Sequence, residues 1–367
     1  MQPVSLARGV PSPDLLPLPE VEACTAAVLA RDARTLLSYG PAPGYQRLRA
    51  GIAERHEVDP ARVLVTNGSL QGIVLVAMHL LAGGERRVLV EAPTYDRTLT
   101  ALRRLGADVV PIPIDGDGLD VDALERELGS GSAPAFLYTI PTFQNPTGAT
   151  LSLPRRLRAA ELARRHGLPI VEDDPYALVR FEGAPLPTLF ELLEGDGVVY
   201  SSSFSKTIAP GLRTGYLVVP PSMAEPLAAL AASSYVAPAV ILQAVVAEFL
   251  ARGHLERTVR RIRRRLRARR DAMLAALAEH LADAQCSRPA GGYFVWLTLP
   301  AGVDARRLLE AAAPLGVTFV PGTDFGGPQN SARLAFSGVS AAEIHTGVAR
   351  LAEALRSLPR GRLRKAA

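Results

Sequence analysis

The stretch SSSFSKTIAPGLRTGY, residues 201–216, combines an unusual lysine with a run of small hydroxyl residues and an arginine. Lysine is rare in this chain: of the 41 Lys and Arg residues, only Lys206 and Lys365 are lysines. A solvated loop is the ordinary place for a single lysine. Lys206, however, follows the apolar run GVVYSSSF (197–204), where a flexible cation has no obvious structural task. At the end of a strand, an amine that can lose its proton suits Schiff-base formation with a carbonyl compound.

The neighbours of Lys206 indicate an anchor for an anion. The serines of residues 201–205 offer hydroxyl groups, and Arg213 offers a planar guanidinium that suits phosphate. The stretch TNGSLQG (66–72) indicates a second anchor, because a Gly-Ser turn there leads from an apolar strand into a helix. The pattern matches neither GxxxxGK[ST] nor GxGxxG, so it indicates neither a P-loop nor a dinucleotide-binding turn.

A set of carboxylates follows another apolar strand, in IVEDDPY (170–176). A solvated strand end accounts for Glu172 and Asp174, but it accounts less well for three consecutive acids after Ile170 and Val171. A reactive lysine, phosphate anchors and a carboxylate for a ring nitrogen together indicate a phosphorylated carbonyl cofactor. Pyridoxal 5′-phosphate (PLP) is the candidate, since it needs a carboxylate at its pyridinium nitrogen.

The order of segments predicts an α/β fold. Strand-like runs alternate with helix-like ones, which is the pattern of a mainly parallel sheet covered by helices. After residue 240 long helices predominate, followed by three further strands of a smaller α+β unit at 291–300, 316–322 and 331–338. For the large unit the predicted strands are 62–69, 87–93, 108–115, 134–141, 168–176 and 197–205.

Composition sets limits on partners and location. With 367 residues, 48% of them hydrophobic and 21% charged, the chain has the profile of a soluble globular protein of two domains or one large α/β unit. Two cysteines, Cys24 and Cys286, favour neither a disulfide framework nor a zinc site and agree with a reducing cytoplasm. The N-terminal residues lack the apolar core of a signal peptide, and the most apolar window, 237–251, is too short to span a membrane.

The net charge of +5 does not indicate nucleic-acid binding. Nine arginines lie in RTVRRIRRRLRARR (257–270), where Val259, Ile262 and Leu266 recur at helical spacing. We therefore expect a helix with one buried stripe and a solvated basic face. The six histidines are scattered and form no close pair or HExxH motif, which favours surface or core roles over metal binding.

The motifs, taken in order, resemble those of fold-type I, class I/II PLP-dependent aminotransferases, especially the 2-aminoadipate-aminotransferase-like branch that also supplies a domain of MocR-type regulators. The resemblance covers nearly the whole chain. It rests on SYGPAPGYQRLR (38–49), TNGSLQG (66–72), EAPTYD (91–96), QNPTG (144–148), EDDPY (172–176), SFSKTIAPGLRTGY (203–216), RPAGGYFVW (288–296) and RLAFSG (333–338).

The resemblance implies roles for the residues around the cofactor ring. Lys206 would form the Schiff base and then move the proton as acid and base. Asp173 would pair with the ring nitrogen, and Tyr95 would stack on the ring. Asn145 and Tyr176 would hydrogen-bond the ring hydroxyl O3′. The phosphate would be held by Gly68, Ser69, Leu70, Ser203 and Arg213, with Ser205 as a further contributor.

It also implies how substrate and subunits are arranged. Arg333 would clamp the substrate α-carboxylate, near Asn145, and Gly9 would approach the same carboxylate. Tyr39 would reach the phosphate of the neighbouring subunit, which implies a homodimer with shared sites. The expected fold has a large domain with a seven-stranded, mainly parallel sheet (41–245), a smaller α+β domain (246–367), and an N-terminal segment (1–40) that packs on the small domain and active site.

The expected activity is transfer of an amino group from an L-amino acid to a 2-oxo acid, by a ping-pong cycle. Elimination or cyclisation of a modified amino acid is the alternative with the same cofactor, because these reactions share a carbanion at Cα. A PLP-sensing regulator is a third possibility. Gly9 already lies in the aminotransferase-like segment, so we expect no winged-helix domain and no nucleic-acid or membrane partner.

Overall fold

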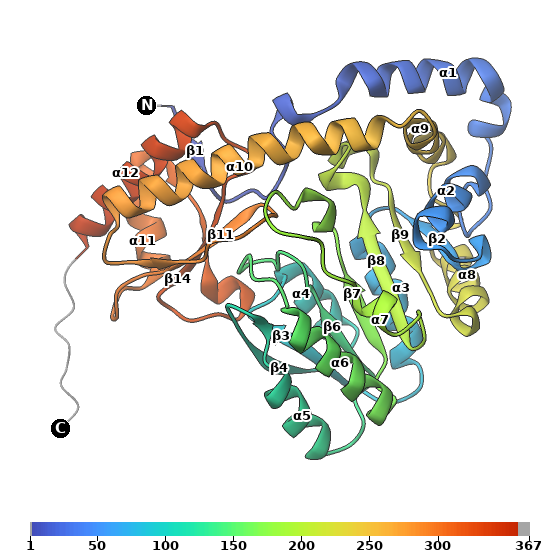
Figure 1. Cartoon of the computed structure of the whole chain (residues 1–367), viewed down its shortest axis with the longest axis horizontal. Coiled ribbons are helices and arrows are strands. Elements are labelled where there is room, and N and C mark those ends of the chain that lie inside the picture. Colours follow the sequence, from blue (N-terminus) through green and yellow to red (C-terminus); the bar gives the residue numbers. More distant parts are fainter. Residues whose placement is uncertain (1, 359–367) are drawn as a thin grey trace.

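A computed structural model describes residues 2–358 of the chain. Figure 1 shows a large unit built around a central sheet and a smaller unit beside it, with the long helix α10 (His254–His280) running along both. The first residues of α10 pack into the core of the large unit, through Leu255 and Val259. From Ile262 onward its buried residues belong to the core of the small unit.

The central sheet has eight strands, and its order is β2-β9-β8-β7-β6-β3-β4-β5. The pairings among β8, β7, β6, β3 and β4 are parallel, whereas β2, β9 and β5 join antiparallel. The resemblance implied seven strands, and the sheet has eight, because the two-residue β5 extends one edge beyond seven strands of at least four residues. Their bounds are β2 Val63–Thr66, β3 Arg87–Ala92, β4 Asp108–Asp115, β5 Gly118–Leu119, β6 Phe136–Thr139, β7 Ile170–Asp173, β8 Val198–Ser203 and β9 Gly215–Val218.

Helices cover both faces of this sheet, which explains why β2, β6, β7, β8 and β9 are buried at every position. One face packs against α3, α4 and α8, and the other against α2, α5, α6, α7 and α9. The bounds are α2 Gln46–His56, α3 Ser69–Leu81, α4 Asp96–Arg104, α5 Val121–Gly129, α6 Leu153–His166, α7 Leu189–Leu192, α8 Pro221–Tyr235 and α9 Val240–Ala251.

The small unit contains an antiparallel sheet of order β10-β11-β14-β13, packed against α10, α11 and α12. The N-terminal segment divides between the two units. Its strand β1 (Val4–Ser5) pairs with β12 (Val317–Thr318) in the small unit, while α1 (Leu18–Leu36) packs against α9 of the large unit. The remaining bounds are β10 Gln285–Cys286, β11 Phe294–Thr298, β13 Val320–Pro321, β14 Ser331–Ala335, α11 Ala305–Ala312 and α12 Ala341–Ser357.

The arginine-rich helix corrects part of the expectation. Val259, Ile262 and Leu266 form the buried stripe, but the basic face is not solvated throughout. Arg269 is buried and pairs with Asp14, and Arg270 is buried and pairs with Glu182. The end of the stretch therefore joins α10 to neighbouring loops. Within residues 2–358, no helix is long and apolar enough to cross a membrane.

Candidate active site

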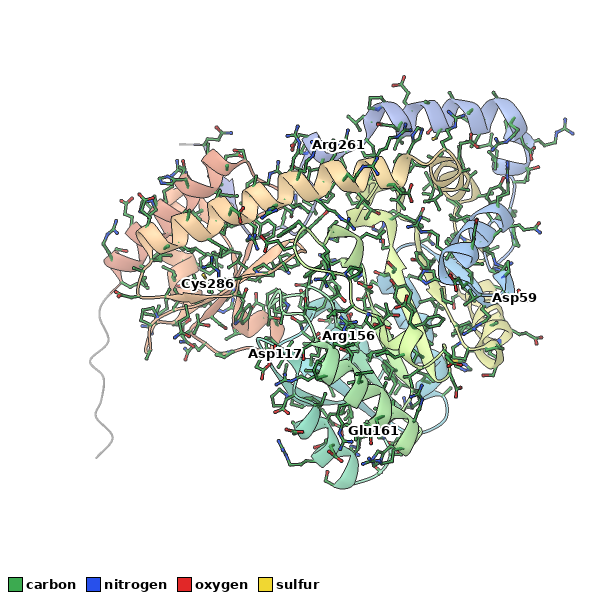
Figure 2. All side chains as sticks on the ribbon, in the orientation of Figure 1. Asp59, Asp117, Arg156, Glu161, Arg261 and Cys286 are labelled. Carbon is green, nitrogen blue, oxygen red and sulfur yellow. The ribbon has the colours of Figure 1, made fainter. Side chains whose placement is uncertain are left out.

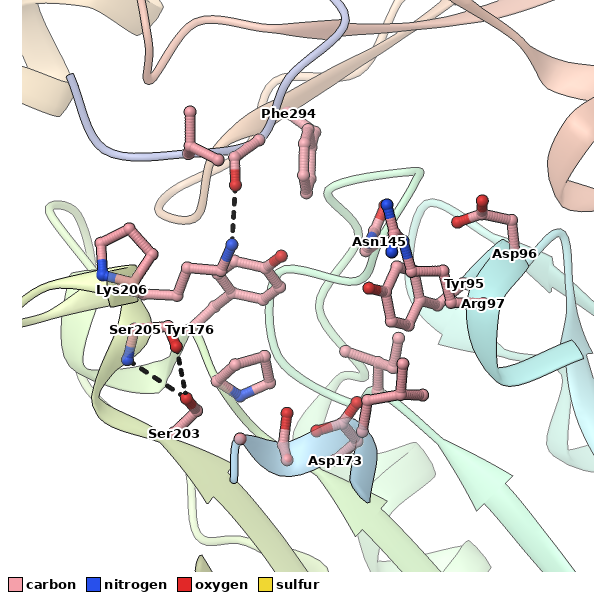
Figure 3. Close-up of a pocket in the computed structure, with 18 of the residues that line it drawn as sticks. Tyr95, Asp96, Arg97, Asn145, Asp173, Tyr176, Ser203, Ser205, Lys206 and Phe294 are labelled. Atoms are coloured by element: carbon pink, nitrogen blue, oxygen red, sulfur yellow. Dashed lines mark hydrogen bonds between the residues drawn. The ribbon is translucent and has the colours of Figure 1, made fainter. Parts of the chain in front are cut away.

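The carboxyl ends of the parallel strands meet at one pocket, with a cavity volume of about 760 Å³. Tyr95 follows β3, Asn145 follows β6, Asp173 ends β7, and Ser203 ends β8 just before Lys206. Open α/β sheets bind ligands at this edge. In Figure 3 Lys206 and Tyr95 face each other across the pocket, with Asp173 on its floor.

Lys206 is half-buried at the end of a short 3₁₀ turn, Phe204–Lys206. Its Nζ donates a 2.7 Å hydrogen bond to the carbonyl oxygen of Gly9 (Figure 3) and lies 5.3 Å from the ring centroid of Tyr293. Burial lowers the pKa of Lys206 to about 8, and the charge of Arg333 acts in the same direction. The amine therefore exchanges a proton near neutral pH, which acid–base catalysis requires.

The two carboxylate oxygens of Asp173 differ in their hydrogen bonding. Its Oδ2 accepts a 2.9 Å hydrogen bond from Tyr138 of β6, whereas Oδ1 is buried and has no partner among the described residues. Burial raises the pKa of Asp173 to about 7, against the effect of the Tyr138 hydrogen bond. A buried carboxylate oxygen without a donor is costly, so a cationic N–H donor beside Oδ1 would relieve that cost and lower the pKa.

The two neighbouring acids are not solvated, which corrects the interpretation of Glu172 and Asp174 as a wet strand end. Glu172 accepts the backbone N–H groups of Leu189 and Phe190, at 3.0 and 2.8 Å. Asp174 accepts the hydroxyl of Tyr200 at 3.1 Å. Both side chains are buried structural groups that fix the ends of β7 and α7.

The turn before α3 forms a cradle for an anion. Gly68 has a left-handed φ of 90° and precedes the first turn of α3, so the N-terminal N–H groups of the helix face the pocket that Gly68, Ser69 and Leu70 line. Arg213 donates from Nη2 to the carbonyl oxygen of Asn67 at 2.9 Å. Its guanidinium packs so closely on Gly68 that a Cβ there would collide with it.

Two serines line the same cradle. Ser203 Oγ and Ser205 Oγ lie 2.9 Å apart, and the Ser205 N–H donates to Ser203 Oγ at 3.1 Å. Gly215 of β9 lies directly behind the turn, where an added Cβ would come within 2.5 Å of the Ser69 nitrogen. A side chain at residue 215 would therefore push the turn out of place.

Arg333 stands at the opposite end of the pocket, on β14 of the small unit. It is only 8% exposed and donates from Nη1 to Asn145 Oδ1 at 2.8 Å, and its Nε has no partner in the part of the chain that the structure describes. The rings of Phe294 and Phe325 lie 4.3 and 4.6 Å from its guanidinium carbon. These contacts fix the plane of the guanidinium, which suits bidentate binding of a carboxylate.

Comparison with known proteins agrees with this geometry. The family model described as aminotransferase class I and II matches residues 3–351. The chain belongs to this family.

Its relatives include aminotransferases of several specificities. The aminotransferase is 39% identical to a 2-aminoadipate transaminase of Thermus thermophilus, over 97% of this chain and 90% of that protein. It is 36% identical to aromatic-amino-acid aminotransferase 1 of Thermococcus litoralis, over 96% of this chain and 88% of that protein. The crystal structure of the α-aminoadipate aminotransferase LysN from T. thermophilus, complexed with N-(5′-phosphopyridoxyl)-L-leucine, has a TM-score of 0.92 at 38% identity, and the match covers 96% of this chain and 92% of that one.

The predictions of fold, enzyme class and cofactor are therefore confirmed: the chain is a fold-type I, PLP-dependent aminotransferase. The residues of the pocket fit that cofactor. Within residues 2–358, Asp173 Oδ1 is an acceptor without a partner, Lys206 is a half-buried amine, and the turn at Gly68 with Arg213 is a built anion cradle.

Nearly all the residues singled out from the sequence line this one pocket. Tyr39 does not line it, and its side chain is 93% exposed. The residues brought together are Gly9, Gly68, Ser69, Leu70, Tyr95, Asn145, Asp173, Tyr176, Ser203, Ser205, Lys206, Arg213 and Arg333.

Sequence reasoning missed the groups that hold these residues in place. Tyr138 supports Asp173, and Glu91 supports the loop of Asn145 by accepting from Ile140 N and Gln144 Nε2, both at 3.1 Å. Glu91 lies inside the motif EAPTYD (91–96), so its position in the sequence could have indicated a role at the site. Tyr138 stands in an apolar strand without any such signal.

Arg156 is a further support, buried on α6 and labelled in the interior of the large unit in Figure 2. It fixes the segment that leads from β6 toward Asn145. Its guanidinium donates to four oxygen atoms, which are the carbonyl oxygens of Leu151 (2.9 Å), Pro187 (2.9 Å) and Pro141 (2.8 Å) and the hydroxyl of Thr142 (2.8 Å).

Proposed function

We propose that this aminotransferase works by a ping-pong cycle in which Lys206 carries the proton and a dicarboxylic 2-oxo acid, first of all 2-oxoglutarate, accepts the amino group. When bound, PLP supplies an electron-withdrawing pyridinium ring that stabilises negative charge at the substrate Cα. The observation that carries the proposal is the convergence of Lys206, Asp173 and Arg333 on one pocket.

Lys206 has the properties of a proton carrier. With its pKa lowered to about 8 by burial, its amine is partly neutral at mildly alkaline pH and takes a proton from the substrate Cα. Its Nζ is held by the carbonyl oxygen of Gly9 and lies over the rings of Tyr176 and Tyr293, which restrict where it can move.

Asp173, Asn145, Tyr176 and Tyr95 would hold the cofactor ring. Asp173 would keep the ring nitrogen protonated through its free Oδ1, while Tyr138 occupies Oδ2. Asn145 and Tyr176 would hydrogen-bond the ring hydroxyl, and Tyr95 would stack on the ring. The phosphate would lie at the N-terminus of α3, contacted by Gly68, Ser69, Leu70, Ser203, Ser205 and Arg213.

Substrate would be oriented by its α-carboxylate on Arg333, with Gly9 and Asn145 alongside. Two more arginines, Arg8 and Arg97, line the same pocket and are exposed, and among the described residues neither has an ion-pair partner. They lie where they can attract a second carboxylate, although Asp96 also lines the pocket and opposes them in part. This pair favours a dicarboxylic acceptor.

The active form would be a homodimer with shared sites. Tyr39 and its neighbour Leu37 are 93% and 71% exposed, so both side chains are accessible to a partner subunit. Tyr39 would cross to the cofactor phosphate of the partner subunit, and the exposed pair would be covered in the dimer.

The experiment is a half-reaction followed by its reversal. Holoenzyme is mixed with single L-amino acids, including glutamate, 2-aminoadipate and phenylalanine, and the cofactor is then extracted and identified. Transamination predicts that pyridoxamine phosphate replaces PLP and that 2-oxoglutarate restores PLP. Release of ammonia or of a cyclised product with PLP unchanged would instead support the elimination or cyclisation alternative.

The role of the two arginines has its own test. The double variant Arg8→Ala/Arg97→Ala should raise the KM for 2-oxoglutarate while the KM for pyruvate, which lacks the second carboxylate, stays the same. Equal changes for both acceptors would contradict the assignment.

A further inference from the structure

Three potential metal ligands meet on the surface of the small unit. Glu279 and His280 are the last two residues of α10, and His345 lies on α12. The two helices pack side by side (Figure 1), which brings His280 and His345 together although 65 residues separate them in the sequence. Their sequence spacing therefore gave no sign of the pair. None of the three side chains lines the active-site pocket.

Each pair of residues has donor atoms at a separation near that of two ligands on a tetrahedral zinc ion, with a different carboxylate oxygen of Glu279 facing each histidine. The Nε2 atoms of His280 and His345 are 3.3 Å apart, and Glu279 Oε2 is 3.3 Å from His345 Nε2. Glu279 Oε1 is 3.6 Å from His280 Nε2. Zinc binds imidazole nitrogen at about 2.0–2.1 Å, so two ligands at the tetrahedral angle stand roughly 3.3 Å apart.

Hydrogen bonding alone satisfies this cluster poorly. Two neutral imidazoles that present Nε2 to each other share a single proton, and two protonated ones repel. The carboxylate approaches the same nitrogen of His345, so three electron-pair donors converge on one region. The rings are 73° apart in plane, with centroids at 4.9 Å, which allows both nitrogen lone pairs to point to a common position.

We propose that Glu279, His280 and His345 bind one Zn²⁺ ion, with water as the fourth ligand, and that the ion links the end of α10 to α12. Two imidazoles and one carboxylate suit zinc and its neighbours Co²⁺ and Ni²⁺, whereas Mg²⁺ and Ca²⁺ prefer oxygen ligands. The His280 side chain is 23% exposed, and those of His345 and Glu279 are 55% and 60% exposed, so solvent reaches the fourth position. Because the ion binds only the folded arrangement, it stabilises the small unit by mass action.

The test uses tag-free, metal-stripped holoenzyme, titrated with Zn²⁺ by calorimetry and with Co²⁺ by visible absorption. We expect one saturable site, a Co²⁺ spectrum of tetrahedral type, no competition from Mg²⁺, and a higher Tm with Zn²⁺. His345→Ala and His280→Ala should each weaken Zn²⁺ binding at least about tenfold and abolish the Tm shift, since even outer-shell changes produce effects of that size. The exposed Glu279→Gln variant should weaken binding without disturbing helix packing.

His166→Ala is the matched control, because His166 is an exposed histidine at the end of α6, outside the cluster. It should bind Zn²⁺ as the wild type does, and transaminase turnover should be unchanged by Zn²⁺ occupancy of the site. The proposal is overturned if the wild type shows no saturable Zn²⁺ binding. It is equally overturned if binding persists unchanged in His280→Ala/His345→Ala.

Discussion

The hydroxyl of Tyr138 donates a 2.9 Å hydrogen bond to Oδ2 of Asp173, while Oδ1 of the same carboxylate is buried without a partner in residues 2–358. Thr98 in turn donates to the Tyr138 oxygen at 3.2 Å. This chain of hydrogen bonds fixes the carboxylate and leaves one oxygen for the ring nitrogen of PLP in the proposed mechanism. In that mechanism Tyr138 would be a positioning residue that acts through Asp173.

Replacing Tyr138 by Phe should therefore slow turnover. The loss removes a hydrogen bond to a charged group, which contributes about 1.5–3 kcal/mol, so kcat should fall roughly tenfold or more with little change in KM. Tyr200→Phe is the control, because Tyr200 makes the same kind of bond to Asp174, outside the pocket. Steady-state kinetics of both variants test this prediction. Equal losses of kcat in the two variants would mean that the Tyr138 hydrogen bond has only a structural role.

Replacing Asp173 by Asn should stabilise the apoenzyme, in a pH-dependent way. Burial raises the pKa of Asp173 from its ordinary 3.8 to about 7, so the folded chain holds a proton that the unfolded chain has released in this range. Its contribution to stability is therefore present at low pH and falls as the pH rises from about 4 to about 7. Asp173→Asn should gain on the order of 1–4 kcal/mol over wild type at pH 8 and nothing at pH 4, measured by urea unfolding.

Asp173→Asn should be unfavourable in the holoenzyme, although it is favourable for the stability of the apoenzyme. A cationic ring nitrogen beside Oδ1 would favour the charged carboxylate, so Asp173→Asn should weaken PLP binding. An Asp173→Asn apoenzyme that is no more stable at pH 8 would argue against the cost of burying the Asp173 charge, and an unchanged PLP affinity would argue against the pairing of Asp173 with the ring nitrogen.

Adding a methyl group at Gly9 should impair substrate binding. A Cβ at this position would collide with the ring of Phe294, which packs on the Arg333 guanidinium. Gly9→Ala should therefore displace the carboxylate clamp and raise the KM for donor and acceptor alike, by about tenfold if the lost interaction is near 1.4 kcal/mol. Gly211→Ala is the control, because nothing lies within 4 Å of a Cβ there. Similar kinetics for both variants would contradict this role of Gly9.

Coexpression of two inactive chains tests whether the site is shared. If Tyr39 acts on the partner subunit, a heterodimer of Lys206→Ala with Tyr39→Ala contains one site with both residues intact and one with neither. Heterodimers isolated through two different tags should then show about half of the wild-type activity per dimer. If Tyr39 acts within its own subunit, no intact site exists and the heterodimer should show only about half of the activity of the Tyr39→Ala homodimer.

The sequence reasoning located residues in the pocket where they follow a recognisable strand. Asp173 and Lys206 stand at strand ends among apolar runs, so their place at the sheet edge followed from the pattern. The sequence reasoning failed where the burial of a side chain depends on a contact with a residue that is distant in the sequence. The helical period of 257–270 indicates which way Arg269 and Arg270 point, but their counter-charges, Asp14 and Glu182, come from distant loops.

Two other features of the structure could not be predicted from the local sequence. Strand β9 has four residues and joins antiparallel inside a motif dominated by Gly215 and Tyr216, so alternation did not reveal it. The support of Asp173 by Tyr138 depends on the register of β6 against β7, which pairs Tyr138 with Val171, and no spacing within one strand encodes it.

The attachment point of PLP tests the central claim most directly, because the chain contains only two lysines, and Lys365 lies outside the described residues. Holoenzyme is reduced with sodium borohydride and digested, and the pyridoxyl group is located by peptide mass spectrometry. We predict the group on Lys206 in the wild type and in Lys365→Arg, none in Lys206→Ala, and a loss of turnover in Lys206→Ala of about 10²–10⁴-fold. A pyridoxyl group on Lys365 or the N-terminal amine with Lys206 unmodified, or wild-type turnover in Lys206→Ala, would contradict the account.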